Sequence, residues 1–291
     1  MDLKPNIAIV TDSTACIPNL FLEELNIHTV AYYIHRNNEV LRDLVSIQYQ
    51  EFLSWLSTAK TIPQTASPGP GDYLSMYENL AEGGAQEILS LHMTSKGSGA
   101  YQAALAAADM LREKLPRLRI EVVDTLNVAL CQGWMAIEAA RAALAGASME
   151  TILEETRRMI SQARIIQTAD TLRYLYMGGR IGKAAHLAGS MLNLKPLISM
   201  QDGEIVALGV TRGLNKAYEK MVALIQAALR PDQKIKIAYL HAGAAEQIQL
   251  LKSKVENRLD CVESFTAELC PALMVHTGPG TTGLCYFPVN Q

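Results

Sequence analysis

Short apolar runs alternate with segments of helical periodicity through the first half of the chain. Strand-like runs stand at residues 6–13, 27–35, 87–93 and 119–124, and segments with helical spacing stand at 18–25, 48–59, 73–82, 100–115 and 130–146. Strands that alternate with helices need crossover connections. The pattern therefore predicts an α/β fold with a mostly parallel sheet flanked by helices.

The pattern changes after about residue 150. A helix at 149–163, a strand at 164–170 and a Gly-punctuated helical segment at 176–194 precede two strands around Asp202-Gly203, a dipeptide typical of hairpin turns. A helix at 214–229, a strand at 235–241 and a helix at 245–259 follow. We predict two domains, an N-terminal α/β domain over residues 1–160 and a C-terminal α+β domain over residues 161–291.

Charge and cysteine content argue against several classes of protein. The net charge of −3 speaks against a broad nucleic-acid surface, which needs clustered Lys and Arg. The five cysteines are odd in number and far apart, which predicts free thiols rather than a disulfide or metal framework. No run approaches the roughly 18 apolar residues of a membrane span, and the start "MDLKPNIAIV" does not resemble a signal peptide. We expect a cytoplasmic protein without a metal site.

Five loops follow strand-like runs with small or polar residues. They are "TDST" (11–14), "TASPGPGD" (65–72), "TSKGSG" (94–99), "VDTLN" (123–127) and "HTGPGTTG" (276–283). Ligands of open parallel sheets bind beyond the carboxyl ends of the strands. These loops are therefore candidates to line one crevice.

Taken singly, each loop also has a purely structural interpretation. Ser95 and Ser98 precede a helix whose first N–H groups lack intrahelical partners, which suits a carboxylate or phosphate but also a simple Ser98 N-cap. Thr65 lies in a turn rich in Pro and Gly. His276 can donate a hydrogen bond to an anion, or merely satisfy a carbonyl.

Motifs of nucleophilic catalysis and phosphate binding are missing from the sequence. Neither G-x-S-x-G nor G-x-x-x-x-G-K-[ST] occurs, and "GGRIGK" lacks the strand–loop–helix spacing of a phosphate loop. No carboxylate pair or His cluster suggests a metal. The residue patterns alone give little support for an enzyme.

The order and spacing of the loops resemble the DegV family, which includes the fatty-acid-binding subunits of bacterial fatty acid kinase. "IAIVTDSTACIP", "TASPGPGDYLSMYENL" and "TSKGSGAYQAA" are similar to the family's TDS loop and to its T-S-Q-P-S-P-G-D and S-S-K-L-S-G-T-Y-Q-S-A stretches. "LRYLYMGGRIGKAAHLAGSMLNLKPLISMQDGEI" is the most specific match, and "HTGPGTTGLCYF" resembles the closing H-x-G-P-G-x-x-G segment.

This resemblance implies a carrier that holds one long-chain fatty acid in an apolar tunnel. The carrier would have no cofactor and no catalytic machinery, and a separate kinase would phosphorylate the carboxylate that it presents. Arg180 and Arg212 look like positions that engage the kinase. Thr65 and Ser95 would hydrogen-bond the carboxylate, with His276 approaching from the last loop. The residues that the resemblance assigns to the ligand are Thr65, Ser95, Ser98, His276 and Gly278.

The chain departs from the family pattern near these positions. Ala66 and Ser67 replace the usual Ser-Gln after the threonine, Gly97 replaces a bulkier residue and Ala100 replaces a hydroxyl residue. Chain length and unsaturation preference therefore do not follow from the resemblance.

Two other functions stay open at this point. One is a lipid hydrolase or phosphotransferase that uses Ser95 with His276. The other is a carrier or sensor of another apolar acid, because the loops would recognise only a head group.

Overall fold

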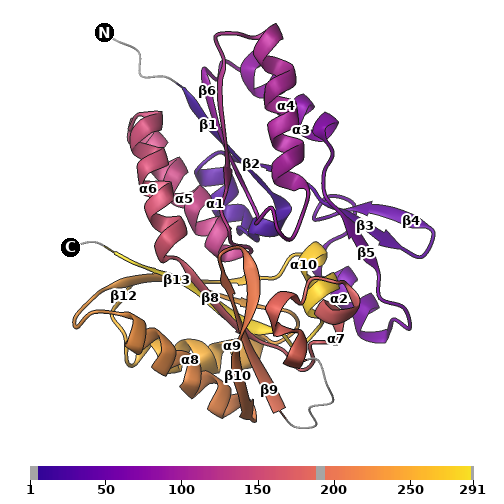
Figure 1. Cartoon of the computed structure of the whole chain (residues 1–291), viewed down its shortest axis with the longest axis vertical. Coiled ribbons are helices and arrows are strands. Elements are labelled where there is room, and N and C mark those ends of the chain that lie inside the picture. Colours follow the sequence, from indigo (N-terminus) through magenta and orange to yellow (C-terminus); the bar gives the residue numbers. More distant parts are fainter. Residues whose placement is uncertain (1–5, 188–193, 290–291) are drawn as a thin grey trace.

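A four-stranded parallel sheet forms the upper part of the molecule in the computed structural model, which describes residues 6–187 and 194–289 (Figure 1). Its spatial order is β2-β1-β6-β7, and all three pairings are parallel. The strands are β1 (Ile7–Asp12), β2 (Ile27–Val30), β6 (Glu87–His92) and β7 (Arg119–Asp124). This sheet confirms the predicted α/β class.

Helices cover both faces of the parallel sheet. The helices α3 (Pro70–Glu82) and α4 (Ala100–Lys114) lie together on one face, and α5 (Leu130–Leu144) and α6 (Met149–Gln162) lie on the other (Figure 1). The sequence of α4 explains why this helix packs against the sheet. Its buried residues recur every three or four positions, which places them on one side of the helix. Those residues are Ala100, Ala104, Ala107, Ala108 and Leu111.

A six-stranded mixed sheet forms the lower part of the molecule. Its order is β10-β9-β8-β13-β11-β12, and only β11 and β12 pair in parallel. The helices α8 (Leu214–Ala228) and α9 (Ala245–Glu256) cover one face (Figure 1). The strands are β8 (Arg164–Thr168), β9 (Leu194–Gln201), β10 (Glu204–Arg212), β11 (Ile235–His241), β12 (Cys261–Glu268) and β13 (Thr282–Pro288).

The hairpin predicted around Asp202 and Gly203 is confirmed. Strands β9 and β10 pair antiparallel on either side of it. Asp202 has a φ of 51° and Gly203 a φ of 79°. Two consecutive positive φ angles are what a two-residue type I′ turn requires.

The single strand predicted over residues 27–35 is wrong. The chain leaves the parallel sheet after β2 and enters a small antiparallel sheet of order β4-β3-β5. The small sheet contains β3 (Tyr33–Arg36), β4 (Glu39–Arg42) and β5 (Gln64–Ala66). Tyr32 lies between the two sheets, and this position matters for the site described below.

The remaining elements are short or were not anticipated. The helical segment expected at 176–194 corresponds to the end of α7 and to η2, and its residues 188–193 lie outside the described residues. Helix α10 and strand β12 were not predicted. The other helices are η1 (Ser13–Ala15), α1 (Asn19–Glu24), α2 (Tyr49–Thr58), α7 (Arg173–Met177), η2 (Gly182–Leu187) and α10 (Pro271–Thr277).

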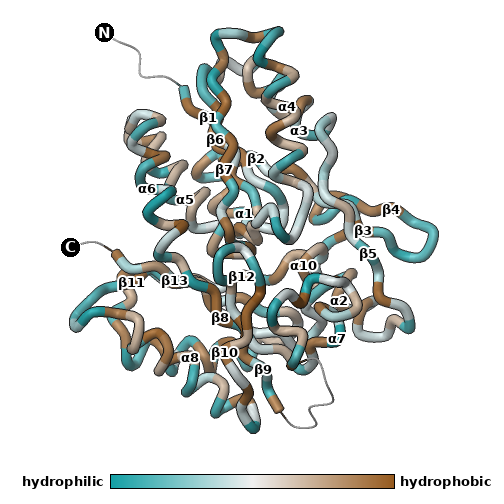
Figure 2. The backbone as a smooth tube through the Cα atoms, in the orientation of Figure 1, coloured by the Kyte–Doolittle hydropathy of each residue, from teal (hydrophilic) through white to brown (hydrophobic). Residues whose placement is uncertain are grey.

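A hydrophobic core runs across both large sheets, and a second one lies between the mixed sheet and helices α8 and α9. Trp134 on α5 lies 4.9 Å from the ring of Phe265 on β12 and 5.5 Å from the ring of Phe287 on β13, measured between ring centroids. In both halves of the molecule, hydrophobic residues, coloured brown, lie along the strands (Figure 2). The predicted division near residue 160 falls at the end of α6, but the core does not stop there.

Candidate functional site

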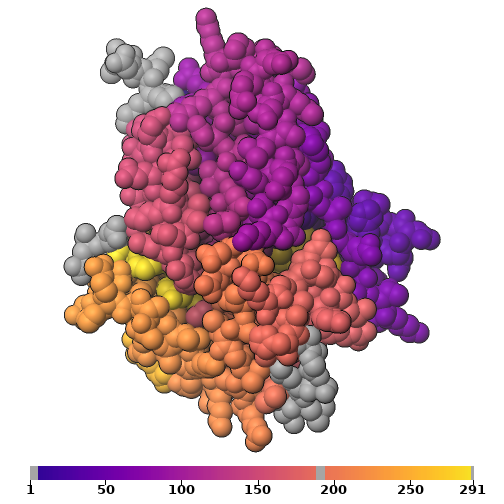
Figure 3. Space-filling view, viewed as in Figure 1, coloured from indigo at the N-terminus to yellow at the C-terminus, as the bar shows by residue number. Residues whose placement is uncertain are grey.

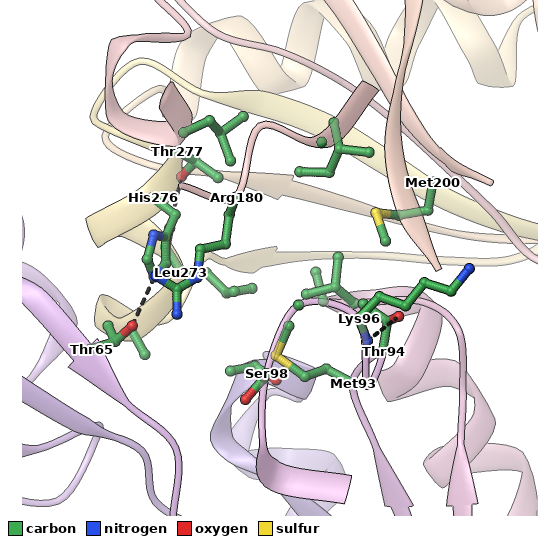
Figure 4. A pocket seen from close by; sticks show the side chains of 18 of the residues that line it. Thr65, Met93, Thr94, Lys96, Ser98, Arg180, Met200, Leu273, His276 and Thr277 are labelled. Carbon is green, nitrogen blue, oxygen red and sulfur yellow. Dashed lines mark hydrogen bonds between the residues drawn. The ribbon is translucent and has the colours of Figure 1, made fainter. Parts of the chain in front are cut away.

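A cavity of about 440 Å³ lies where the loops of the parallel sheet meet the mixed sheet (Figure 4). Four of the five predicted loops contribute to its wall. The fifth, residues 123–127, does not, but Val128 and Ala129 directly after it do. In the space-filling view a hollow lies at this junction, beside the orange β9–β10 hairpin (Figure 3).

The sheet topology explains why these loops converge. The chain continues from β1 to its neighbour β2 on one side and from β6 to its neighbour β7 on the other, so the loops after β1 and β6 leave in opposite directions. Loops at such a switch point diverge and leave a crevice beyond the strand ends. Thr14, after β1, and Ser98, after β6, both line the cavity.

Thr65 and His276 face each other at one end of the cavity (Figure 4). Thr65 Oγ1 lies 2.8 Å from His276 Nε2, although the two residues are 211 positions apart. Strand β5 carries Thr65 and helix α10 carries His276. Burial, with a smaller contribution from the Arg180 charge, lowers the pKa of His276 to about 4. The imidazole is therefore neutral at pH 7.

The placement of His276 depends on Gly178. A Cβ at position 178 would lie 2.6 Å from His276 Nδ1. This nitrogen is buried and has no hydrogen-bond partner among the described residues. The glycine therefore lets the turn after α7 pass directly against the imidazole edge.

Tyr32 and Ser98 form a second hydroxyl pair in the wall. Tyr32 Oη lies 2.6 Å from Ser98 Oγ, and Ala100 N–H donates to Ser98 Oγ at 3.3 Å. Burial raises the pKa of Tyr32 well above its ordinary value, so the phenol keeps its proton. Whichever hydroxyl donates to the other, one hydroxyl hydrogen is left for a ligand.

Ser95 is not among the residues that line the cavity, and its role as a carboxylate ligand stays a prediction. Its backbone N–H donates to Asp124 Oδ2 at 3.2 Å, whereas Thr94 and Lys96 on either side of it line the cavity. No hydrogen bond joins Ser95 to His276 within the described residues, so the pair required by the hydrolase alternative is not assembled.

The other predicted residues separate into two groups. Arg180 lines the cavity, is exposed, and donates to the Gly178 carbonyl at 2.7 Å. Gly278 ends α10 outside the cavity wall, and a Cβ there would collide with the Tyr174 ring. Arg212 ends β10 on the surface, also away from the wall.

The β9–β10 hairpin closes part of the cavity from the mixed sheet. Thr94 Oγ1 donates to the Gly203 carbonyl at 2.9 Å. Glu204 forms ion pairs with Lys183 at 2.8 Å and with Lys96 at 4.0 Å. Gly203 and Glu204 both line the cavity, so the turn is part of its wall.

A Ser–His–Asp chain lies elsewhere, inside the parallel sheet. His92 Nε2 is 2.7 Å from Ser90 Oγ, and His92 Nδ1 is 3.2 Å from Asp12 Oδ2. All three residues are 0% exposed, and none lines the cavity. Asp12 in turn accepts the backbone N–H of Thr14. These three side chains therefore support the wall from inside the sheet and are not accessible to a substrate.

Sequence reasoning missed several wall residues. Tyr32 stood within a run taken as one strand, and Gln167 stood within the strand predicted at 164–170. Lys96 was visible in the "TSKGSG" loop, but no motif singled it out. Only the tertiary arrangement brings them to the cavity.

Residues 6–187 and 194–289 contain neither a metal-binding cluster nor a membrane-spanning helix. No group of three or more His, Cys, Asp and Glu side chains is arranged to hold a metal ion. Over the same ranges, no helix has the length and hydropathy needed to traverse a bilayer.

Comparison with known families gives a match over nearly the whole chain. The model of the DegV family, described as uncharacterised proteins, matches residues 6–289. The chain belongs to the DegV family. A DegV domain-containing protein of Deinococcus radiodurans is 30% identical over 285 residues, which cover 98% of this chain and 99% of that protein. Protein DegV of Bacillus subtilis is 27% identical over 282 residues, with 97% and 99% covered.

Several solved structures have the same fold. A fatty-acid-binding DegV protein from Thermus thermophilus is 31% identical with a TM-score of 0.90, covering 98% of this chain and 100% of that one. DegV from Bacillus subtilis, a fatty acid binding protein, is 26% identical with a TM-score of 0.88 and the same coverage. A stearic-acid-binding protein from Eubacterium ventriosum is 26% identical with a TM-score of 0.86, covering 97% and 98%.

Proposed function

We propose that this DegV-family protein binds one long-chain fatty acid in the cavity and presents its carboxylate to a separate kinase, which forms the acyl phosphate. The observation that carries the proposal is the hydrogen-bonding pair of Thr65 and His276 in the cavity wall, with the Ser98 hydroxyl in the same wall. Fatty acid binding by the similar proteins of Thermus thermophilus and Bacillus subtilis supports it.

The head group would be held mainly by neutral donors. A carboxylate in a dry cavity is costly unless it is hydrogen-bonded. When His276 Nε2–H donates to Thr65 Oγ1, the Thr65 hydroxyl hydrogen is free to bind the carboxylate. The Tyr32–Ser98 pair offers a second hydroxyl hydrogen. Arg180 adds a positive charge at the same wall.

The tail would supply most of the affinity. Each buried methylene contributes about 0.8 kcal/mol, so an acid of about sixteen carbons gains on the order of 12 kcal/mol before association costs of about 4–15 kcal/mol. Met93, Met200 and Leu273 line the cavity and can adapt to such a chain.

We assign the serine contact to Ser98 in place of Ser95. Ser98 lines the cavity and shares a hydrogen bond with Tyr32, whereas Ser95 lies outside the wall. Ser95 helps to fix the loop through its backbone bond to Asp124.

Binding of the acid and of its methyl ester tests this assignment. The double variant Thr65→Ala, Ser98→Ala should bind hexadecanoic acid at least tenfold more weakly, because each lost hydrogen bond to a charged group is worth about 1.5–3 kcal/mol. The methyl ester should bind with nearly unchanged affinity. Ser95→Ala is the matched control and should bind both ligands like the wild type. Equal losses for acid and ester would contradict the proposed head-group site.

The cargo and the kinase step need separate measurements. Native mass spectrometry of the purified protein should reveal a bound species of fatty-acid mass. With ATP and a bacterial fatty acid kinase catalytic subunit, the loaded protein should yield acyl phosphate. Arg212→Ala should lower this yield without changing fatty acid affinity, because Arg212 lies away from the cavity wall. An unchanged yield would remove Arg212 from the kinase contact.

The alternatives predict different results. A hydrolase or phosphotransferase would show covalent labelling of Ser95 by a phosphonate probe, whereas a carrier would stay unlabelled with its lipid bound. A carrier or sensor of another apolar acid would prefer that acid in competition against hexadecanoic acid.

A further inference from the structure

Gln167 brings a side chain with a terminal amide to the cavity wall. It lies on β8 and is 8% exposed. Its neighbour Ile166 packs into the core beneath α8 and α9. Because successive strand residues point to opposite faces, Gln167 points to the other face, where the mixed sheet borders the cavity.

Strand β13, which pairs with β8, has a glycine opposite Gln167. Gly283 on β13 is its direct partner across the sheet. A Cβ on Gly283 would lie 2.7 Å from the Cβ of Gln167, so any larger residue would displace the glutamine. The glycine therefore leaves room for the Gln167 side chain at this position.

Gln167 differs from the other buried polar side chains of the wall in lacking a partner. Thr14 donates to Asp12, Thr94 donates to the Gly203 carbonyl, and Thr277 donates to the Leu273 carbonyl. Tyr32 pairs with Ser98. The Gln167 carboxamide has no hydrogen bond to any residue within 6–187 and 194–289.

An unpaired amide is a poor neighbour for a plain hydrocarbon chain. An acyl chain lying against the amide would remove it from water without offering a hydrogen bond, which is unfavourable because a methylene group can neither donate nor accept one. A hydroxyl group can, because a carboxamide offers both a donor and an acceptor and a hydroxyl uses either. A site built to pair with a hydroxyl also discriminates against the analogue that lacks it.

We propose that Gln167 binds a hydroxyl group on the acyl chain, so that the preferred cargo is a hydroxylated long-chain acid. This inference rests on the proposed fatty acid function and adds a second polar contact to it. Gln167 would act on specificity, whereas Thr65, Ser98 and His276 would hold the carboxylate.

Binding measurements with a series of acids test the inference. The probes are octadecanoic acid, its methyl ester and octadecanoic acids that carry one hydroxyl at different carbons along the chain. For the wild type, at least one hydroxylated isomer should bind tenfold or more tightly than octadecanoic acid. In Gln167→Leu this preference should disappear, while octadecanoic acid binds at least as tightly as before.

A matched variant and three outcomes complete the experiment. Gln226→Leu makes the same exchange at an exposed position on α8 outside the cavity wall and should keep the hydroxyl preference. If no isomer is preferred by a wild type that binds octadecanoic acid, Gln167 serves only to hold a water molecule and the inference fails while the proposed function stands. If no acid binds, both fail. If Gln167→Leu weakens binding of octadecanoic acid but not of its methyl ester, the amide belongs to the head-group site and the inference is overturned.

Discussion

The imidazole of His276 occupies the space that a side chain on Gly178 would need. A Cβ there would lie 2.6 Å from Nδ1, and Gly178 has an ordinary helical backbone. Gly178→Ala should therefore displace His276 by collision alone. Overpacking of this kind costs about 1–3 kcal/mol. We expect a lower free energy of unfolding in urea and at least tenfold weaker fatty acid binding. Gly71→Ala in α3, where nothing lies within 4 Å, is the control: it should not weaken binding, and it should not lower the free energy of unfolding because alanine is the better helix former.

The low pKa of His276 predicts acid sensitivity. The unfolded histidine binds a proton below about 6.5, whereas the folded one does so only below about 4. Between these values the unfolded state holds more protons, so stability falls as the pH falls. From pH 7 to pH 5 the wild type should lose roughly 2 kcal/mol more than His276→Gln. Parallel pH profiles from urea unfolding would contradict this prediction.

Binding of an anion should reverse the shift at His276. A carboxylate beside the ring favours its protonated form, so the pKa of His276 should rise when a fatty acid binds. Binding near pH 5 should then take up a proton. Calorimetry in two buffers with different ionisation enthalpies measures this uptake directly. His276→Gln should show much less uptake, and equal uptake in both proteins would assign the proton to another group.

Asp43 should have the opposite pH dependence. Burial raises the pKa of Asp43 to about 6, although its Oδ1 accepts the Ala272 N–H at 3.1 Å. Between about 3.8 and 6 the folded state holds the extra proton, so this group makes stability fall as the pH rises. Asp43→Asn keeps an acceptor for Ala272 without the charge. Its stability at pH 7 should equal or exceed that of the wild type, and a clear loss there would contradict this account.

The hairpin turn at Gly203 should be intolerant of any side chain. Its φ is +79°, and a Cβ would lie 2.5 Å from Thr94 Oγ1. Gly84→Ala is the matched control, because Gly84 has a φ of +94° but nothing within 4 Å. Both variants carry backbone strain of about 1–3 kcal/mol. Gly203→Ala should lose more stability than Gly84→Ala in thermal unfolding, and equal losses would mean that the collision is relieved at no cost.

Much of the fold could be predicted because most elements carry their own periodicity. The strands of the parallel sheet, helix α4 and the Asp202–Gly203 hairpin are examples. Helix α10 could not, since it has only seven residues, starts with Pro271 and is buried on nearly every side, which leaves no amphipathic stripe. The break at Tyr32 was equally invisible, because both sides of it are strand-like and only their sheet partners differ.

The candidate site was predictable as a set of loops but not as a set of contacts. Thr65, Ser95, Ser98 and His276 stood out by type and by family pattern, and all but Ser95 line the cavity. The choice between Ser95 and Ser98 depends on the path of one turn, which follows from the bond between Ser95 and Asp124. Gln167 gave no signal, because a polar residue within a strand is ordinarily taken to face solvent.

The docking of the β9–β10 hairpin against Thr94 means that the cavity belongs to neither half of the protein. Its walls are complete only while the mixed sheet and the parallel sheet stay together. A bound acyl chain would then act as a removable piece of the core, one that joins the two halves while it is present. Release of the acid would also weaken the contact between the two halves. The affinity for the acid and the stability of that contact would therefore be thermodynamically coupled.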